Sequence, residues 1–132
     1  MVHLRIGKTI SIRWRLFISG RPITSDDNLT LFITDSKGRK ERVEISNVAD
    51  GILSAVYKTT FRSALGVYTL TVWLDYGSDY EAPVDAINAF ALVPFSNQET
   101  TNIDPETGIV ILESNIEIGA ADTINGHNTI FI

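Results

Sequence analysis

Apolar residues recur at every second position along most of the first 93 residues, and this period is typical of β-strands with one buried face. The first such stretch places five apolar side chains on a shared face: Ile10, Ile12, Trp14, Leu16 and Ile18. Further strands are expected at residues 29–33, 41–46, 52–58, 67–75 and 84–93. No stretch has the spacing of an amphipathic helix, so the pattern predicts an all-β protein.

Turn residues between these stretches indicate how the strands are connected. Residues 35–38 (Asp-Ser-Lys-Gly) and 50–51 (Asp-Gly) favour tight turns. The run Gly66-Val67-Tyr68-Thr69-Leu70 places a tyrosine at the start of a late strand, two residues before an apolar core position. In immunoglobulin domains the hydroxyl of such a tyrosine bonds back to the chain at a tyrosine corner. We therefore predict an immunoglobulin-like β-sandwich with Tyr68 as its structural tyrosine corner.

The character of the chain changes after Pro94, where an extended C-terminal β arm is expected. Residues 95–106 are rich in Asn, Gln and Thr and predict a linker. The candidate assembly residues of the arm form two apolar runs: Ile109, Val110, Ile111 and Leu112, and then Ile130, Phe131 and Ile132. An apolar end is expected to dock, because chain ends otherwise fray in water. The expected division is a sandwich over residues 1–95 and a linker with the arm over residues 96–132, with pairing in cis or in trans left open.

Composition and charge narrow the classes of function. A chain of 132 residues can form one domain with a sizeable core, and the absence of cysteine excludes disulfides and thiolate metal sites. The net charge of −5 argues against binding nucleic acid through its phosphates. All 11 Lys and Arg lie between Arg5 and Arg62, whereas 10 of the 16 Asp and Glu follow Ser63. This asymmetry favours interacting surfaces or an interacting tail, or else two halves that neutralise each other within one fold.

The expected location follows from the absence of targeting signals. The N-terminus lacks the charged segment and apolar run of a secretory signal. The longest nearly apolar stretch, residues 86–95, is too short to span a bilayer. We therefore expect a protein made in the cytosol without a signal peptide and without membrane insertion.

Candidate chemistry is sparse along this chain. His3 and His127 lie near opposite ends, and neither accompanies the nucleophile motif of a hydrolytic triad. The acidic loop at residues 75–81 has carboxylates at spacings that could ligate calcium, but it lacks the EF-hand pattern, so a solvated hairpin loop is the preferred interpretation. Trp73, Tyr76 and Tyr80 could instead form a contact surface, because aromatic residues are favoured at interfaces. We expect no catalytic residues, no metal site and no cofactor, and hence a protein that is not an enzyme.

Four runs carry a resemblance to a known group of proteins. They are Ile12-Arg13-Trp14, Leu29-Thr30-Leu31, the tyrosine-corner run at residues 66–70, and the run Val-Asp-Ala-Ile-Asn-Ala-Phe-Ala-Leu-Val-Pro at residues 84–94. Over residues 5–97 the chain resembles the small immunoglobulin-like tail or baseplate proteins of phages and prophages of gut Bacteroides-type bacteria. The resemblance implies a virion component that mounts or spaces receptor-binding fibres, with itself and other virion proteins as partners. These motifs are structural, so the resemblance transfers no catalytic residue.

Two functional hypotheses follow. The leading one is a non-enzymatic phage virion structural protein, a tail, baseplate or fibre-attachment module that acts through protein–protein assembly as a homo-oligomer and with other virion proteins. The alternative is a surface carbohydrate- or receptor-binding β-sandwich module with Trp73, Tyr76 and Tyr80 as an aromatic platform.

Overall fold

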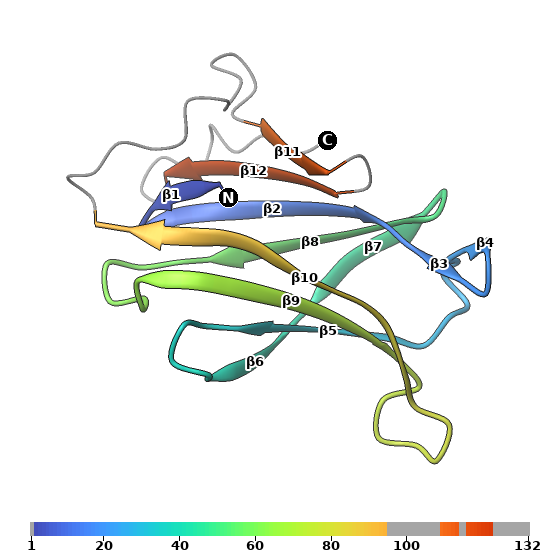
Figure 1. Cartoon of the computed structure of the whole chain (residues 1–132). Coiled ribbons are helices and arrows are strands. Elements are labelled where there is room, and N and C mark those ends of the chain that lie inside the picture. Colours follow the sequence, from blue (N-terminus) through green and yellow to red (C-terminus); the bar gives the residue numbers. More distant parts are fainter. Residues whose placement is uncertain (1, 95–108, 114–115, 123–132) are drawn as a thin grey trace.

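The computed structural model describes residues 2–94, 109–113 and 116–122, which form a β-sandwich of two five-stranded sheets (Figure 1). Sheet A has the order β1 (His3–Arg5), β10 (Ala82–Val93), β9 (Gly66–Leu74), β5 (Leu29–Thr34) and β6 (Lys40–Val43). Sheet B has the order β11 (Ile109–Glu113), β12 (Ile116–Asp122), β2 (Lys8–Arg15), β8 (Ile52–Lys58) and β7 (Ile45–Ala49). A short hairpin of β3 (Phe17–Ile18) and β4 (Arg21–Pro22) lies at one end of the sandwich. The described residues form no helix, and the prediction of an all-β protein is confirmed.

The core between the two sheets is filled by the side chains that the alternating pattern identified. Successive side chains of a strand point to opposite faces, so every second residue enters the core. Nearly complete burial is found on β2 for Ile10, Ile12 and Trp14, on β5 for Leu31 and Ile33, and on β9 for Tyr68, Leu70 and Val72.

Tyr68 makes the hydrogen bond that a tyrosine corner requires. Its hydroxyl donates to the carbonyl oxygen of Ala64 at 2.8 Å, four residues upstream. Its ring stacks on that of Phe90 in β10, with the ring centroids 5.2 Å apart. Burial raises the pKa of the phenol above its ordinary value, so the hydroxyl stays protonated and able to donate over a wider pH range. The bond fastens the turn before β9 to the core beneath it.

The single strand predicted at residues 41–46 is instead two strands that belong to different sheets. β6 ends at Val43 in sheet A, and β7 begins at Ile45 in sheet B, with the exposed Glu44 between them. Val43 is buried and Ile45 is half-buried, so the period of two continues through the crossing. Alternation reports which side chains face inward, and it does not report that the chain has changed sheet.

The beginning of the chain also differs from the predicted arrangement. The structure has an additional strand, β1, which runs parallel to β10 and pairs Leu4 with Leu92. Three residues are too few for alternation to be recognised in the sequence. The first predicted strand is shorter than expected, because β2 stops at Arg15 and Phe17 begins the separate hairpin strand β3.

The C-terminal strands complete sheet B in cis. β12 pairs antiparallel with β2 over seven positions, from Ile116 opposite Trp14 to Asp122 opposite Lys8, and β11 pairs with the other side of β12. Ile116 and Ile118 are 0% and 1% exposed and belong to the core cluster. A sandwich confined to residues 1–95 therefore does not describe sheet B, which takes two of its strands from beyond that boundary.

Candidate interaction surface

The outer face of sheet A brings aromatic, threonine and basic side chains to adjacent positions. Residues two apart on a strand share a face, so this face alternates with the core residues of β5 and β9. The register places Thr30 beside Trp73, and Phe32 between Arg42 and Thr71. It also places Thr34 between Lys40 and Thr69. The sequence singled out only Trp73 among these residues.

Phe32, Trp73 and Tyr76 form an aromatic cluster on this face. The Tyr76 ring meets Phe32 edge-on with centroids 4.8 Å apart, and it meets Trp73 at 5.9 Å with an interplanar angle of 66°. Tyr76 follows β9 and its ring lies over Phe32, which is only 7% exposed although it lies outside the core cluster. Tyr76 itself is 39% exposed. The cluster thus presents a partly covered apolar centre on an otherwise polar sheet face.

Two cations from edge strand β6 border the aromatic cluster. The Lys40 Nζ lies 4.1 Å from the centroid of the Phe32 ring and 5.4 Å from that of Tyr76. The Arg42 guanidinium carbon lies 5.7 Å and 6.0 Å from the same two rings. Cations over aromatic faces are attracted by the ring quadrupole, and their aliphatic stems cover apolar surface. Each cation is held by rings, and within the described residues neither Lys40 nor Arg42 has an ion-pair partner.

The indole of Trp73 adds a buried donor to the cluster. Its Nε1 is inaccessible to solvent and has no hydrogen-bond partner among the described residues. Such groups are uncommon because a buried unpaired donor costs about 1–3 kcal/mol.

The acidic loop that follows β9 is ordered by its own hydrogen bonds. The backbone N–H of Gly77 donates to Glu81 Oε2 at 3.0 Å, and the Ser78 hydroxyl donates to the Asp75 carbonyl oxygen at 2.8 Å. Asp75 has a positive φ of 53°, which an acidic turn residue tolerates. Across the described part of the chain, no group of three or more His, Cys, Asp and Glu residues is arranged to hold a metal ion.

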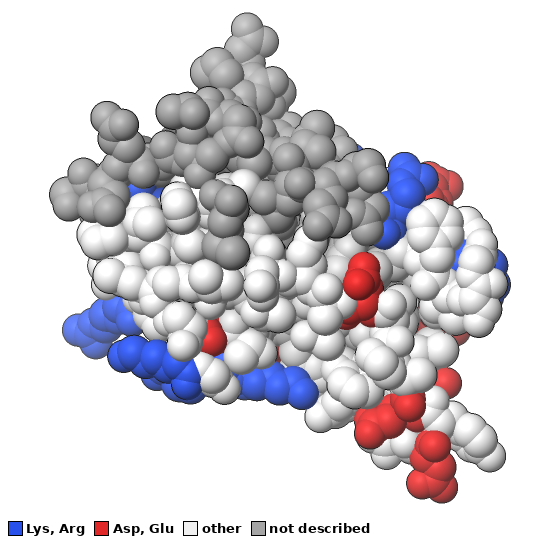
Figure 2. All heavy atoms as spheres, in the orientation of Figure 1, with Lys and Arg blue, Asp and Glu red and all other residues white. Residues whose placement is uncertain are grey.

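Charge is unevenly distributed beside the aromatic cluster. Figure 2 shows Lys and Arg side chains gathered at the lower left and Asp and Glu side chains at the lower right of the molecule. The exposed basic residues near this face belong to the β5–β6 hairpin, namely Lys37, Arg39, Lys40 and Arg42. The exposed acidic ones, Asp79 and Glu81, belong to the β9–β10 loop. The asymmetry seen along the sequence therefore persists within one sheet.

The predicted contact residues are brought together only in part. Trp73 and Tyr76 are neighbours, whereas Tyr80 is 84% exposed and has no ring contact with them among the described residues. Phe32, Lys40 and Arg42 were not predicted as site residues. The alternating pattern marked Leu31 and Ile33 as inward, which places Phe32 on the outer face of the same strand. A large apolar residue at such an outward position was the signal that could have identified Phe32.

The other sequence candidates lie away from this cluster. His3 is exposed on β1, and His127 lies outside the described residues. Of the candidate assembly residues, Ile109, Val110, Ile111 and Leu112 belong to strand β11. Ile130, Phe131 and Ile132 lie outside the described residues.

A recess of about 250 Å³ between the sheets is lined by eight residues: Ile33, Asp35, Arg39, Glu41, Tyr57, Ser63, Ala64 and Tyr68. The Tyr57 hydroxyl donates to Glu41 Oε2 at 3.4 Å, and Arg39 Nε lies 2.9 Å from Asp35 Oδ2. Burial, followed by the charge of Glu41, raises the pKa of Tyr57 to about 12. Acid–base catalysis is favoured by a pKa near the working pH, so this tyrosine is suited to hydrogen bonding and not to proton transfer.

Comparison with known protein families, with characterised proteins and with solved structures finds no significant match to this chain. No helix among the described residues is long and apolar enough to cross a membrane.

Proposed function

We propose that this chain is a non-enzymatic structural module that works through protein–protein assembly, and that the assembly is a phage virion. The observation that carries the assembly role is the aromatic cluster of Phe32, Trp73 and Tyr76 with Lys40 and Arg42 beside it. Aromatic residues and arginine are enriched in protein interfaces and supply most of their binding energy. The virion context rests on the resemblance of residues 5–97 to phage tail and baseplate proteins.

An immunoglobulin-like identity for the sandwich is part of the same proposal. It is supported by the distribution of strands, since β5, β9 and β10 lie in one sheet and β2, β8 and β7 in the other. Immunoglobulin domains divide their C, F and G strands from their B, E and D strands in this way. The hydrogen bond from Tyr68 to Ala64 supports it further.

The assembly surface is tested by a matched pair of tyrosine substitutions. We expect Tyr76→Ala to lower the solution mass measured by light scattering, because it removes the ring that covers Phe32, whereas Tyr80→Ala should not. Urea unfolding of both variants checks that the sandwich stays folded. A wild-type protein that is monomeric at every concentration, or equal masses for both variants, would contradict self-assembly through this face.

The virion context needs a separate measurement. Mass spectrometry of particles purified from lysates of the source strain should detect this chain at a fixed ratio to the other particle proteins. Its absence from intact particles would contradict the virion proposal and leave the assembly surface to serve another complex.

The second candidate function is carbohydrate or receptor binding by the same aromatic residues. Its favouring observation is the adjacency of Trp73 and Tyr76 on an open sheet face. Their rings meet at 66°, however, so they do not offer the coplanar surface on which successive sugar rings stack. Glycan arrays probed with the wild type and with Trp73→Ala would decide, because a sugar site requires signal in the first and its loss in the second.

A further inference from the structure

The free edge of sheet B has the features of a strand-addition site. β7 is the last strand of that sheet, and its pairing is with β8 alone in the described part of the chain. An edge strand presents alternate N–H and C=O groups that another extended chain can use. Edges that must stay free are usually protected by charges, proline or a β-bulge within the strand. β7 reads Ile45-Ser46-Asn47-Val48-Ala49 and contains neither a charge nor a proline. Its pairing with β8 is irregular between Ile45 and Asn47 and regular from Asn47 to Ala49, so the regular part of the edge is the part beside a hollow at the end of β7.

A hollow adjoins the end of this edge. It has a volume of about 850 Å³ and lies between the end of β7 and the segment that contains β4. Its lining is Arg21, Pro22, Ile23, Thr24, Ser25, Val48, Ala49, Asp50 and Gly51. Peptide recognition by strand addition combines main-chain hydrogen bonds along an edge with pockets for side chains of the added strand. β7 and the hollow supply both elements side by side.

The β7–β8 turn beside the hollow is packed against β4. Asp50 and Gly51 both have positive φ, 54° and 76°. A Cβ placed on Gly51 would lie 2.9 Å from the Cβ of Pro22, so this glycine is packed directly against β4. Arg21 is held by Asp27 at 2.7 Å. The hollow is therefore bordered by a turn packed against β4 and by an ion-paired arginine.

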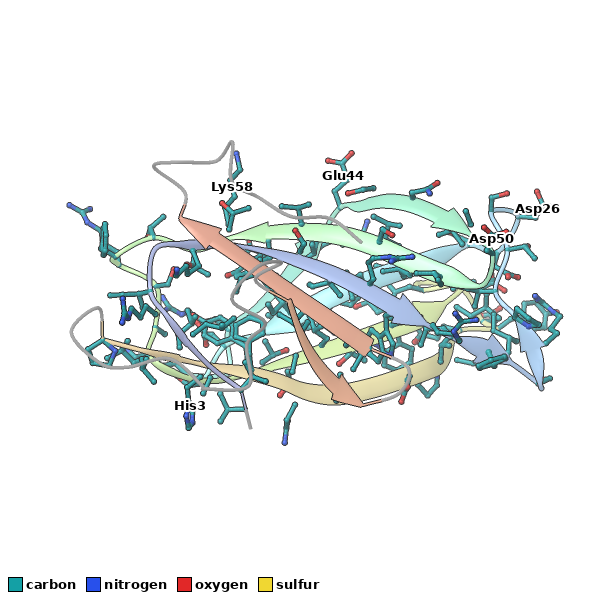
Figure 3. The ribbon with its side chains drawn as sticks, turned by 90° about the horizontal axis from the view of Figure 1, so that it is seen from above. His3, Asp26, Glu44, Asp50 and Lys58 are labelled. Carbon is teal, nitrogen blue, oxygen red and sulfur yellow. The ribbon has the colours of Figure 1, made fainter. Side chains whose placement is uncertain are left out.

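Carboxylates flank the edge at both ends. Figure 3 labels Glu44 before β7, Asp50 after it, and Asp26 beyond Asp50 near the same end. Glu44 and Asp50 are six residues apart, which corresponds to about 20 Å along an extended chain. A partner strand would therefore need two cationic residues at a similar separation.

The same charges disfavour a second copy of this chain at the edge. An antiparallel pair of β7 strands centred on Asn47 would place Glu44 of each copy opposite Asp50 of the other. A parallel pair would place like residues side by side. Like charges directly opposite each other destabilise strand pairs. Glu44 and Asp50 therefore disfavour pairing of β7 with the β7 strand of a second copy.

We propose that β7 and its adjoining hollow bind an extended segment of another protein by strand addition. The segment has uncharged, β-forming residues in its centre and Lys or Arg near both ends. Main-chain hydrogen bonds to β7 hold it, Glu44 and Asp50 pair with its basic ends, and an apolar side chain enters the hollow beside Val48. This site lies on sheet B, opposite the sheet that carries the aromatic cluster, so it does not depend on the function proposed above.

The test uses the full-length protein and the peptide acetyl-Lys-Thr-Val-Thr-Val-Thr-Lys-amide. At about 1 mM, a concentration at which weak sites are occupied, the peptide should shift the NMR amide resonances of residues 45–49. A peptide with Glu in place of both Lys should cause much smaller shifts. Unchanged β7 resonances, or equal shifts with both peptides, would overturn the proposal.

Two N-methylated forms of the peptide test strand addition itself. Methyl groups on the odd-numbered amides block one hydrogen-bonding edge of the peptide, and methyl groups on the even-numbered amides block the other. Because an added strand uses one edge, one form should lose binding and the other should retain it. Equal binding by both forms would overturn the strand-addition mode.

The charge requirement is tested by neutralising both flanks of the edge. The double variant Glu44→Gln, Asp50→Asn should weaken binding about threefold to tenfold, the range expected for two exposed ion pairs. The matched control, Asp79→Asn with Glu81→Gln, changes the net charge equally but lies in the β9–β10 loop. Equal weakening by the two variants would show that overall charge, and not the edge, attracts the peptide, and would overturn the assignment to Glu44 and Asp50.

Discussion

The substitution Ile118→Ala tests whether the C-terminal strand is part of the core of its own chain. Ile118 is 1% exposed and lies opposite Ile12 on β2, which is equally buried. The substitution removes three carbon atoms, worth about 2.4 kcal/mol in transfer free energy, and the cavity that remains raises the expected loss to about 3–4 kcal/mol. With a urea dependence of about 2 kcal/mol per molar, the unfolding midpoint should fall by about 1.5–2 M.

Urea unfolding followed by tryptophan fluorescence is a suitable assay, because Trp14 is buried opposite Ile116. Ile33→Ala, on β5 in sheet A, is the core reference and should cost a similar amount. Val67→Ala is the surface control, since Val67 is 37% exposed and its loss should cost about 0.5 kcal/mol or less. If Ile118→Ala behaves like Val67→Ala, β12 is not in the core. If the midpoint rises with protein concentration, the strand comes from another chain.

Three further predictions address single contacts. Tyr68→Phe removes the hydrogen bond to Ala64 and should lower the free energy of unfolding by about 1–3 kcal/mol; a change near zero would mean that the corner is not stabilising. The pKa of Tyr57 is raised to about 12, so as pH rises the unfolded state loses the Tyr57 proton before the folded state does. The stabilisation of the folded state by this shift is therefore complete below pH 10 and is lost as pH rises toward 12. Tyr57→Phe should flatten the fall in urea midpoint over that interval, and an unchanged slope would refute the assignment. Gly66→Ala brings a Cβ to 2.7 Å from Ser36 at a φ of +111°, so it should destabilise more than Gly77→Ala, whose Cβ meets nothing within 4 Å; equal thermal midpoints would contradict this.

The candidate site could be predicted only where its residues carried a local signal. Trp73 and Tyr76 stood out because they are aromatic residues at the end of a clear strand. Lys40 and Arg42 lie on β6, which the sequence merged with β7 into one strand over residues 41–46. Their contacts with Phe32 depend on β5 and β6 pairing in one register. Tyr80 has the same residue type as Tyr76 but a different environment, which the sequence could not distinguish.

The free edge of sheet B could not be recognised in the sequence for a related reason. The predicted strand ended at Ser46, so residues 47–49 were not expected to extend it to Ala49. The alternating pattern also does not report whether a strand is central or terminal in a sheet. Position in the sheet follows from pairings between residues that are far apart in the chain. The hollow beside β7 likewise requires residues 21–25 and 48–51 to meet.

From the sequence alone followed the all-β class, the inward residues of most strands and the position of Tyr68 at the start of a late strand. Each of these depends on a period of two or on a short run of neighbours, which local stereochemistry imposes on the chain. The tertiary structure decided that the chain changes sheet at Glu44, that β1 runs parallel to β10, and that β12 completes sheet B beside β2. Other orders of the same strands within the two sheets would bury the same side chains. Only the packing of both sheets against one another selects among them.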